Sequence, residues 1–163
     1  MAKDASFDIV SQVDMQEVDN ALNQAEKEIV NRFDFKGSNT KIERKDEEIN
    51  LDTTDDMKMS NIIDVLEGKL VKRGVNLKSF EYGKIEPSLG GRVKQTIKIR
   101  VGLDKDQARK ITMKIKELKL KVTPSVQGDV VRVTGKNKDD LQTAITALKA
   151  ADFDFAIQFT NYR

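Results

Sequence analysis

The segment VRVTGK, which joins a predicted strand to a predicted helix, carries the residue types of a phosphate-binding turn. Arg132 offers a planar guanidinium fork that suits two phosphate oxygens, and Thr134 and Lys136 add a hydroxyl and an ammonium group. Gly135 lets the backbone approach a ligand closely, and the helix that follows presents free N–H groups at its start. The G-x-x-x-x-G-K-[ST] spacing is absent, so ATP hydrolysis of the P-loop type is not expected, and a plain strand-to-helix turn is the alternative.

A second group of charged side chains lies in the segment RFDFKG, where a predicted helix meets a predicted strand. Phe33 continues the apolar stripe of the helix and Phe35 points the same way along the strand. Both are therefore predicted to be core residues rather than base-stacking platforms. Arg32, Asp34 and Lys36 then face the polar side, where they are candidates for contacts with a ligand.

The last six residues, QFTNYR, place polar and aromatic side chains where a ligand could meet them. Arg163 is the candidate phosphate contact of this segment, with Gln158, Thr160 and Tyr162 beside it. The alternative is a terminal segment without a fixed structure.

The segment RVKQTIKIRV is typical of a strand with one apolar and one cationic face. Arg92, Lys94, Lys98 and Arg100 alternate with other side chains and therefore project to the same side. Like charges this close repel one another unless an anion or nearby acids compensate them. The strand is therefore either a phosphate-contacting platform or a surface neutralised by Asp and Glu. A lysine-rich helix over residues 105–119 follows and would strengthen the positive field.

Composition restricts the chemistry that these 163 residues can support. The sequence has no Cys and no His, so it offers no thiolate nucleophile, no imidazole base and no zinc site of the usual nitrogen and sulfur kind. Catalysis would have to rely on Asp, Glu, Lys, Ser or Tyr alone, and we expect neither an enzyme activity nor a cofactor. No apolar run approaches the roughly 18 residues of a membrane span, and the N-terminus lacks the apolar core of a signal peptide. A cytoplasmic protein without membrane contact is predicted.

Charge is distributed unevenly along the chain. Residues 1–81 contain 12 Lys and Arg against 18 Asp and Glu, a net charge of −6, whereas residues 82–163 contain 17 against 9, a net charge of +8. A basic half favours a polyanion or an acidic partner. The alternative is intramolecular, with an acidic half that faces a basic one.

Hydrophobic periodicity predicts the same order of elements in both halves: strand, helix, strand, strand, helix, strand. Asp14 and Glu17 form a capping-box pattern before the first helix, and Gly74 ends the second. The glycine-containing segment GKIEPSLGGR is predicted to connect the halves. Helices are predicted over 15–32, around Met59 to Leu70, over 105–119 and after Asn137, and strands over 7–13, 35–43, 49–53, 75–82, 92–101, 121–135 (a hairpin) and 153–159.

Core positions recur at an offset of 82 residues, which indicates an internal duplication. Ile49 corresponds to Val131, and Met59 corresponds to Leu141. The order of elements is that of a ferredoxin-like βαββαβ module, so the predicted fold class is α+β with two such modules. Pro124 removes a backbone donor from its strand, which is therefore predicted to be an edge strand, as the second strand of such a module is.

Six stretches of the sequence resemble the YajQ family of bacterial proteins. They are SFDIVSQVD, RFDFKG, KLVKRG, KLKV, QGDVVRVTGKNKDDLQ and QFTNYR, which occur in the family's order and together span nearly the whole chain. The resemblance implies two ferredoxin-like modules that exchange their first strands. Residues 14–90 would be completed by strand 92–101, and residues 102–163 by strand 6–13. The basic strand would then lie in the acidic half, where its compensation is easier.

The YajQ family is described as nucleotide-binding, and some members look like cyclic di-GMP effectors that act through protein partners. The resemblance therefore implies a nucleotide-binding protein without catalytic activity, either an effector of cyclic di-GMP or another nucleotide, or a binder of short nucleic acid such as RNA. The alternative is a protein-interaction adaptor whose charged surfaces meet a regulatory protein. Where the residue chemistry and the family's motifs coincide, the candidate nucleotide-binding residues are Arg32, Asp34, Lys36, Arg132, Thr134, Lys136 and Arg163.

Overall fold

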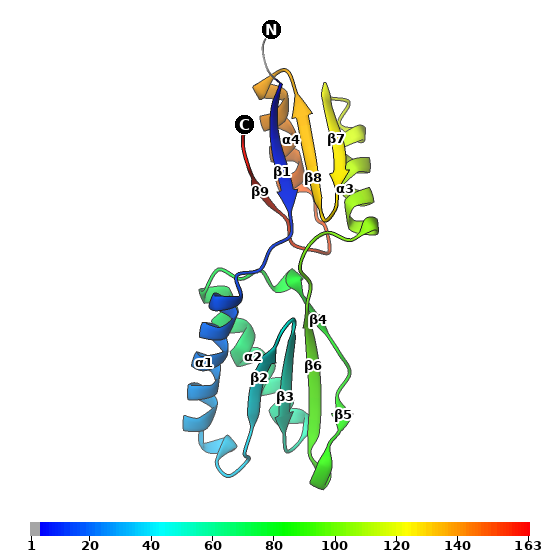
Figure 1. Cartoon of the computed structure of the whole chain (residues 1–163). Coiled ribbons are helices and arrows are strands. Elements are labelled where there is room, and N and C mark those ends of the chain that lie inside the picture. Colours follow the sequence, from blue (N-terminus) through cyan, green and yellow to red (C-terminus); the bar gives the residue numbers. More distant parts are fainter. Residues whose placement is uncertain (1–3) are drawn as a thin grey trace. The chain divides into compact units, whose positions relative to one another are not determined.

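The computed structural model describes residues 4–163 and divides the chain into two compact units (Figure 1). The first unit comprises Val13–Arg100, and the second comprises the chain up to Gln12 together with Val101–Arg163. Each unit contains an antiparallel sheet and two long helices, so the predicted α+β class is confirmed. Across the described residues, no helix combines the length and apolar character needed to span a membrane.

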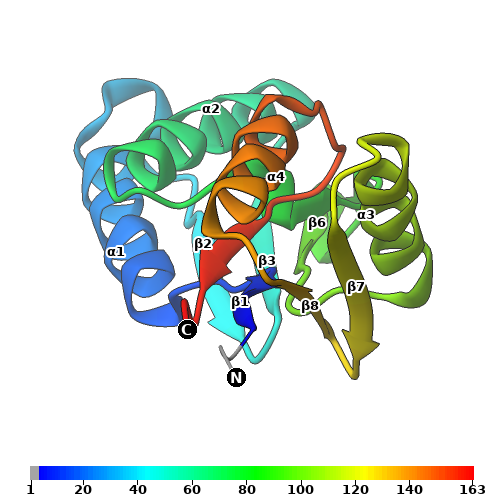
Figure 2. The ribbon, with the colours of Figure 1, turned by 90° about the horizontal axis from the view of Figure 1, so that it is seen from above.

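The first unit is built on a sheet with the strand order β2-β3-β6-β4, and the short strand β5 also pairs with β6. The helices α1 and α2 pack against one another and against the sheet (Figure 2). In chain order its elements are α1 (Met15–Asn31), a 3-10 turn (Phe33–Phe35), β2 (Lys41–Lys45), β3 (Glu48–Thr53), α2 (Asp56–Lys72), a 3-10 turn (Leu77–Ser79), β4 (Phe80–Tyr82), β5 (Glu86–Pro87), a 3-10 turn (Leu89–Gly91) and β6 (Val93–Ile99).

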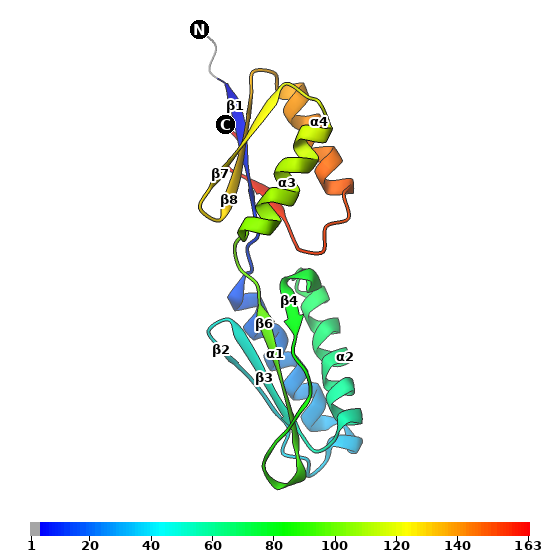
Figure 3. The ribbon, with the colours of Figure 1, turned by 90° about the vertical axis from the view of Figure 1, so that its right-hand side faces the viewer.

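The second unit is built on a sheet with the strand order β7-β8-β1-β9, and α3 and α4 cover one of its faces (Figure 3). Its elements are β1 (Ala5–Val10), α3 (Lys105–Glu117), β7 (Val122–Gln127), β8 (Val130–Gly135), α4 (Lys138–Ala150) and β9 (Gln158–Thr160). Pro124 lies in β7, which is an edge strand, as the sequence predicts.

The second sheet takes one of its two inner strands from a distant part of the chain, whereas the strands of the first sheet all come from one continuous segment. In the second unit, β1 lies between β8 and β9, with Phe7 opposite Val133 and Ile9 opposite Phe159. In the first unit, β6 lies between β3 and β4, with Ile97 opposite Ile49. The chain therefore passes between the units twice, near residues 12–13 and 100–101.

Each unit has its own apolar core, and alternation along the strands decides which side chains enter it. In the second unit, Phe7 and Ile9 of β1 and Val131 and Val133 of β8 are buried with Ile111 of α3. The opposite face of this sheet carries polar residues of all four strands. They are Ser6, Asp8, Thr123, Ser125, Arg132, Thr134 and Thr160.

Helix starts follow the sequence signals. Asp14 accepts hydrogen bonds from the backbone N–H groups of Gln16 and Glu17, and it caps α1 as predicted. The Glu17 side chain accepts from Asn20 instead of completing a capping box there. A full capping box occurs at α3, between Asp104 and Gln107. Asn137 caps α4 through the N–H of Asp139.

The RFDFKG prediction is wrong for the strand and for one phenylalanine. The chain forms a 3-10 turn over Phe33–Phe35 instead of a strand that begins at Phe35, and β2 begins only at Lys41. The Lys36 N–H donates to the carbonyl of Phe33 and closes this turn. In a turn of this kind the two rings no longer point to the same side. Phe35 is buried, as predicted, whereas 89% of Phe33 is exposed.

Three other segments also differ from the predictions. The segment GKIEPSLGGR lies within the first unit, where β5 pairs with β6, and does not join the two units. Strand 75–82 is regular only over Phe80–Tyr82, after a 3-10 turn. Strand 153–159 is regular only over Gln158–Thr160, and the rings of Phe153 and Phe155 before it stack on each other with their centroids 5.1 Å apart.

Candidate functional site

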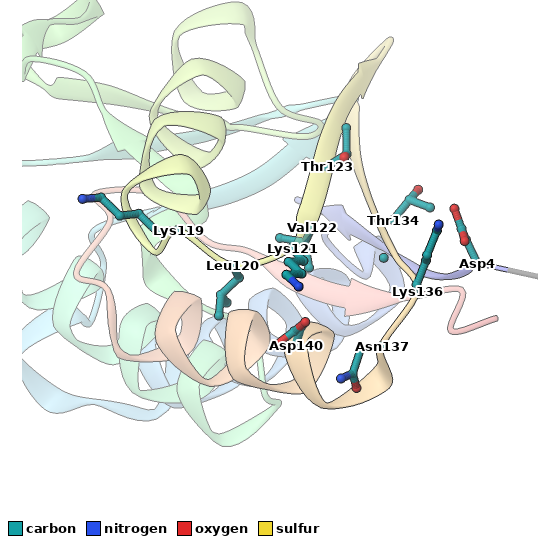
Figure 4. Close-up of a pocket in the computed structure, with 11 residues that line it drawn as sticks. Asp4, Lys119, Leu120, Lys121, Val122, Thr123, Thr134, Lys136, Asn137 and Asp140 are labelled. Carbon is teal, nitrogen blue, oxygen red and sulfur yellow. The ribbon is translucent and has the colours of Figure 1, made fainter.

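A lysine-lined hollow with a volume of about 1110 Å³ lies in the second unit (Figure 4). Its walls come from the end of the α3–β7 connection, the start of β7, the end of β8 and the first turn of α4. The side chains of Lys121, Thr123, Thr134 and Lys136 all line it. Ammonium and hydroxyl groups are therefore grouped beside the start of a helix, which is the chemistry of an anion site.

Strand register explains why residues far apart in sequence share this hollow. Gly135 at the end of β8 is opposite Val122 at the start of β7, so Lys121 and Lys136 both lie just beyond the paired residues. A Cβ atom on Gly135 would lie 3.2 Å from the Lys121 carbonyl oxygen and from a methyl group of Val122. Glycine therefore allows the two strand ends to approach each other at the base of the hollow.

The charges of the hollow are only partly balanced. Asp4 and Asp140 also line it, together with three lysines. The Lys119 side chain points away from the others (Figure 4), which leaves Lys121 and Lys136, drawn apart from each other, as the remaining lysines of the hollow. Within residues 4–163, neither of these two ammonium groups forms an ion pair with a carboxylate. They are available to an anion in a way that the arginines below are not.

Arg132, the strongest sequence candidate, is occupied by the protein itself. Its Nε donates to Asp8 at 2.9 Å, and Asp8 also accepts from the Asn161 side chain at 2.8 Å. Asp8 is only 3% exposed, so the pair is part of the folded structure. The hydrogen bond from Arg132, opposed by burial and assisted by Asn161, holds the pKa of Asp8 below its ordinary value of 3.8. Arg132 binds a carboxylate here, where the sequence suggested a phosphate.

Arg163 lines a different, smaller hollow, to which α4 contributes Lys138, Leu141, Gln142 and Ile145. Its backbone is tied to β1, because the Arg163 N–H donates to the Ser6 carbonyl at 2.9 Å and the Ser6 N–H donates back at 3.2 Å. The last segment of the chain is therefore held in place at the edge of the sheet.

The RFDFKG candidates lie in the first unit. Arg32 and Asp34 pair with each other through two hydrogen bonds of 3.1 and 2.9 Å, and the Arg32 guanidinium lies 5.4 Å from the centre of the Phe35 ring. Lys36 is exposed beside them. Of the predicted residues, Thr134 and Lys136 are the two that line the lysine-lined hollow. Arg32, Asp34 and Lys36 do not line it.

Acids of the first unit compensate the cationic strand. Arg92 donates to Asp52 at 2.6 Å and to the backbone carbonyls of Ser38 and Asn39. Burial tends to raise the pKa of Asp52, but hydrogen bonds from Arg92 and Ser88 outweigh it, and the pKa lies below its ordinary value. Lys98 is opposite Glu48 on one neighbouring strand and Glu81 on the other. Between the two alternatives for this strand, the contacts favour the neutralised surface.

Sequence reasoning missed Lys121 and Thr123 as site residues. Lys121 follows a lysine-rich helix, where one more lysine carries little signal. Lys121 becomes a site candidate only through the pairing of β7 with β8, which brings it to the same hollow as Lys136. The hairpin turn at Gly128 was the available signal, because counting back from it on both strands gives this register.

The fold and the hollow together define an α+β protein of two units, one of which carries a hollow lined by lysine and threonine residues. A family model described as "Nucleotide-binding protein YajQ-like" matches residues 5–163 of the chain. The chain therefore belongs to the YajQ-like family.

Relatives with curated names are similar over their full lengths. A protein of Alkaliphilus oremlandii is 62% identical over 163 residues and covers 100% of both chains. One of Desulfitobacterium hafniense (strain DSM 10664 / DCB-2) is 55% identical over 163 residues, and one of Chloroherpeton thalassium is 48% identical over 165 residues, each with 100% of both chains covered. All three carry the name "Nucleotide-binding protein".

Proposed function

We propose that this protein binds a nucleotide through its phosphate, in the hollow lined by Lys121 and Lys136. The observation that carries the proposal is the pair of lysines without carboxylate partners beside the start of α4. Helix N-termini favour anions because their first N–H groups lack intrahelical acceptors. The hydroxyl groups of Thr123 and Thr134 supply further donors, and the names of the relatives support a nucleotide as the anion.

We propose that the protein is cytoplasmic and that it binds its ligand without catalysing a reaction. Cyclic di-GMP, other nucleotides and short nucleic acids all carry the phosphate that the lysines would contact. A direct titration separates them, because oligonucleotide binding driven by several phosphate contacts weakens steeply as salt concentration rises. Incubation with each bound nucleotide, followed by chromatography, would detect any turnover and so contradict a purely binding role.

Charge reversal at the hollow is the direct test. We expect Lys121→Glu plus Lys136→Glu to weaken nucleotide binding by at least about tenfold, since two charge-assisted contacts are lost and two repulsive charges are added. Lys105→Glu plus Lys116→Glu changes the net charge equally on α3, outside the hollow, and should leave affinity nearly unchanged. Isothermal titration calorimetry at low salt measures both variants.

Equal weakening in both double variants would show that net charge, and not this hollow, governs binding. If no nucleotide or oligonucleotide binds the unaltered protein at low salt, the adaptor function becomes the better account. A regulatory protein that meets the charged surfaces would then be the partner to look for.

We also propose that the two units are ferredoxin-like modules that arose by duplication. Both sheets have an equivalent strand order, with β1 between β8 and β9 in one and β6 between β3 and β4 in the other. The pairs Ile49 with Val131 and Met59 with Leu141, 82 residues apart, are buried in equivalent elements. A structural superposition of the units in which these pairs coincide would support the duplication, and a shifted register would count against it.

A further inference from the structure

A second hollow of about 310 Å³ lies beside the start of α4 and has mainly apolar walls. Phe7 of β1 and Leu141 and Ile145 of α4 form these walls, and Gln142 and Lys138 add an amide and an ammonium group. The volume is at the lower end of small-molecule pockets, and an apolar slot with a few polar groups is their usual composition. A single flat ring suits such a slot better than a chain of charged groups would.

Tyr162 supplies an aromatic ring at this second hollow. The ring lies 6.4 Å from that of Phe7, at an angle of 34°, and 63% of the residue is exposed. Its backbone is fixed on both sides, since the Asn161 side chain donates to Asp8 and the backbone of Arg163 is hydrogen-bonded to Ser6. An exposed ring on an anchored segment can stack on a ligand at a low cost in conformational entropy.

No described residue lines both the second hollow and the lysine-lined hollow, but residues adjacent in sequence line the two. Asp4 lines the lysine-lined hollow and Ala5, its neighbour, lines the second. The start of α4 shows the same arrangement twice. Asn137 and Asp140 line the lysine-lined hollow, whereas the residues that follow them, Lys138 and Leu141, line the second hollow. A molecule with an anionic end and a flat apolar end, joined by one short linker, could therefore occupy both.

We propose that the second hollow binds the base of the nucleotide whose phosphate lies in the lysine-lined hollow, with Tyr162 stacked on the base. This inference rests on the proposed function. It assigns the ligand class as a nucleotide with an aromatic base, since an apolar slot with an aromatic ring and an amide accepts the face and edge of a base. Gln142 offers both a donor and an acceptor, and therefore sets no strong preference among bases by itself.

Comparison of a nucleotide with its baseless counterpart tests this assignment. The probes are GMP and ribose 5-phosphate, titrated into the full-length protein and into Tyr162→Ala. Phe33→Ala is the matched control, because Phe33 is an exposed aromatic residue of the first unit. We expect GMP to bind the unaltered protein about tenfold more tightly than ribose 5-phosphate, and Tyr162→Ala to remove this difference while ribose 5-phosphate binding stays unchanged.

The Lys121→Glu plus Lys136→Glu variant separates this inference from the proposed function. If GMP and ribose 5-phosphate bind the unaltered protein equally, and both are lost in the lysine variant, the base assignment is wrong and phosphate binding stands. The same conclusion follows if Tyr162→Ala and Phe33→Ala weaken GMP equally. If neither probe binds the unaltered protein, both the base assignment and the proposed function are overturned.

Discussion

At the residue scale, three of the arginines have a different role from the two lysines of the proposed site. Arg132, Arg92 and Arg32 each form hydrogen bonds with a carboxylate of the same unit at 2.6 to 3.1 Å. Lys121 and Lys136 line a hollow instead. The planar guanidinium group suits fixed carboxylate pairs, whereas an ammonium on a flexible stem is well solvated until a ligand arrives. The residues to change when binding is tested are therefore the lysines.

Asp8 gives a prediction about acid stability. Its pKa is lowered in the folded protein, so its contribution is complete above its ordinary pKa of 3.8 and is lost as the pH falls through the lower folded value. We expect Asp8→Asn to reduce the free energy of unfolding by about 2 kcal/mol at pH 7, since a charged hydrogen-bond acceptor is lost. This deficit should shrink toward zero below pH 3.8.

Urea denaturation at several pH values, followed by NMR signals of the second unit, measures that deficit. Asp106→Asn is the matched control, because Asp106 is exposed on α3 in the same unit. A deficit of Asp8→Asn that stays constant from pH 7 to low pH would show that the charge of Asp8 contributes nothing.

At the element scale, regular periodicity was a reliable guide and short turns were not. The sequence predicts a helix over 15–32 and the structure has Met15–Asn31, because a long apolar stripe and the Asp14 cap act together. RFDFKG was mispredicted because a 3-10 turn is set by two or three hydrogen bonds that leave no periodic pattern. Of the candidate site, Thr134 and Lys136 were within reach of sequence reasoning, whereas Lys121 required the pairing of β7 with β8.

The junction of β4 and β6 gives a prediction on stability. A Cβ atom at Gly83 would lie 2.7 Å from the Thr96 carbonyl oxygen, whereas one at Gly68 in α2 would meet nothing within 4 Å. We expect Gly83→Ala to destabilise the first unit by about 1–3 kcal/mol, since the backbone must shift. Gly68→Ala should stabilise it by about 1 kcal/mol, because alanine favours the helix. Thermal denaturation of both variants checks the contrast, and similar melting temperatures would contradict it.

At the scale of the whole molecule, the division of the chain into its two units changes the distribution of charge. By sequence, the second unit carries 13 Lys and Arg against 10 Asp and Glu, a net charge of +3, and the first carries 16 against 17, a net charge of −1. The difference between the sequence halves, −6 against +8, is therefore largely removed, because the basic strand β6 joins the acidic unit. Counting charge along the chain therefore overestimated the difference in net charge between the two units.

The strand content of each unit also predicts which fragments fold. Residues 13–100 contain every strand of the first sheet, so we expect this fragment to show a cooperative unfolding transition by circular dichroism. Residues 101–163 lack β1, which is an inner strand and buries Phe7 and Ile9. This second fragment should stay unfolded alone. Cooperative unfolding of 101–163 by itself would show that β1 is dispensable.

The central claim is that a nucleotide phosphate binds in the lysine-lined hollow of the second unit. The most direct measurement is a titration of the ¹⁵N-labelled protein with GMP, followed through its backbone amide NMR signals. The account predicts shifts concentrated at Lys121–Thr123 and Thr134–Asp140, which contain most of the residues that line the hollow. Shifts confined to the first unit, for example around Arg32 and Lys36, would contradict it.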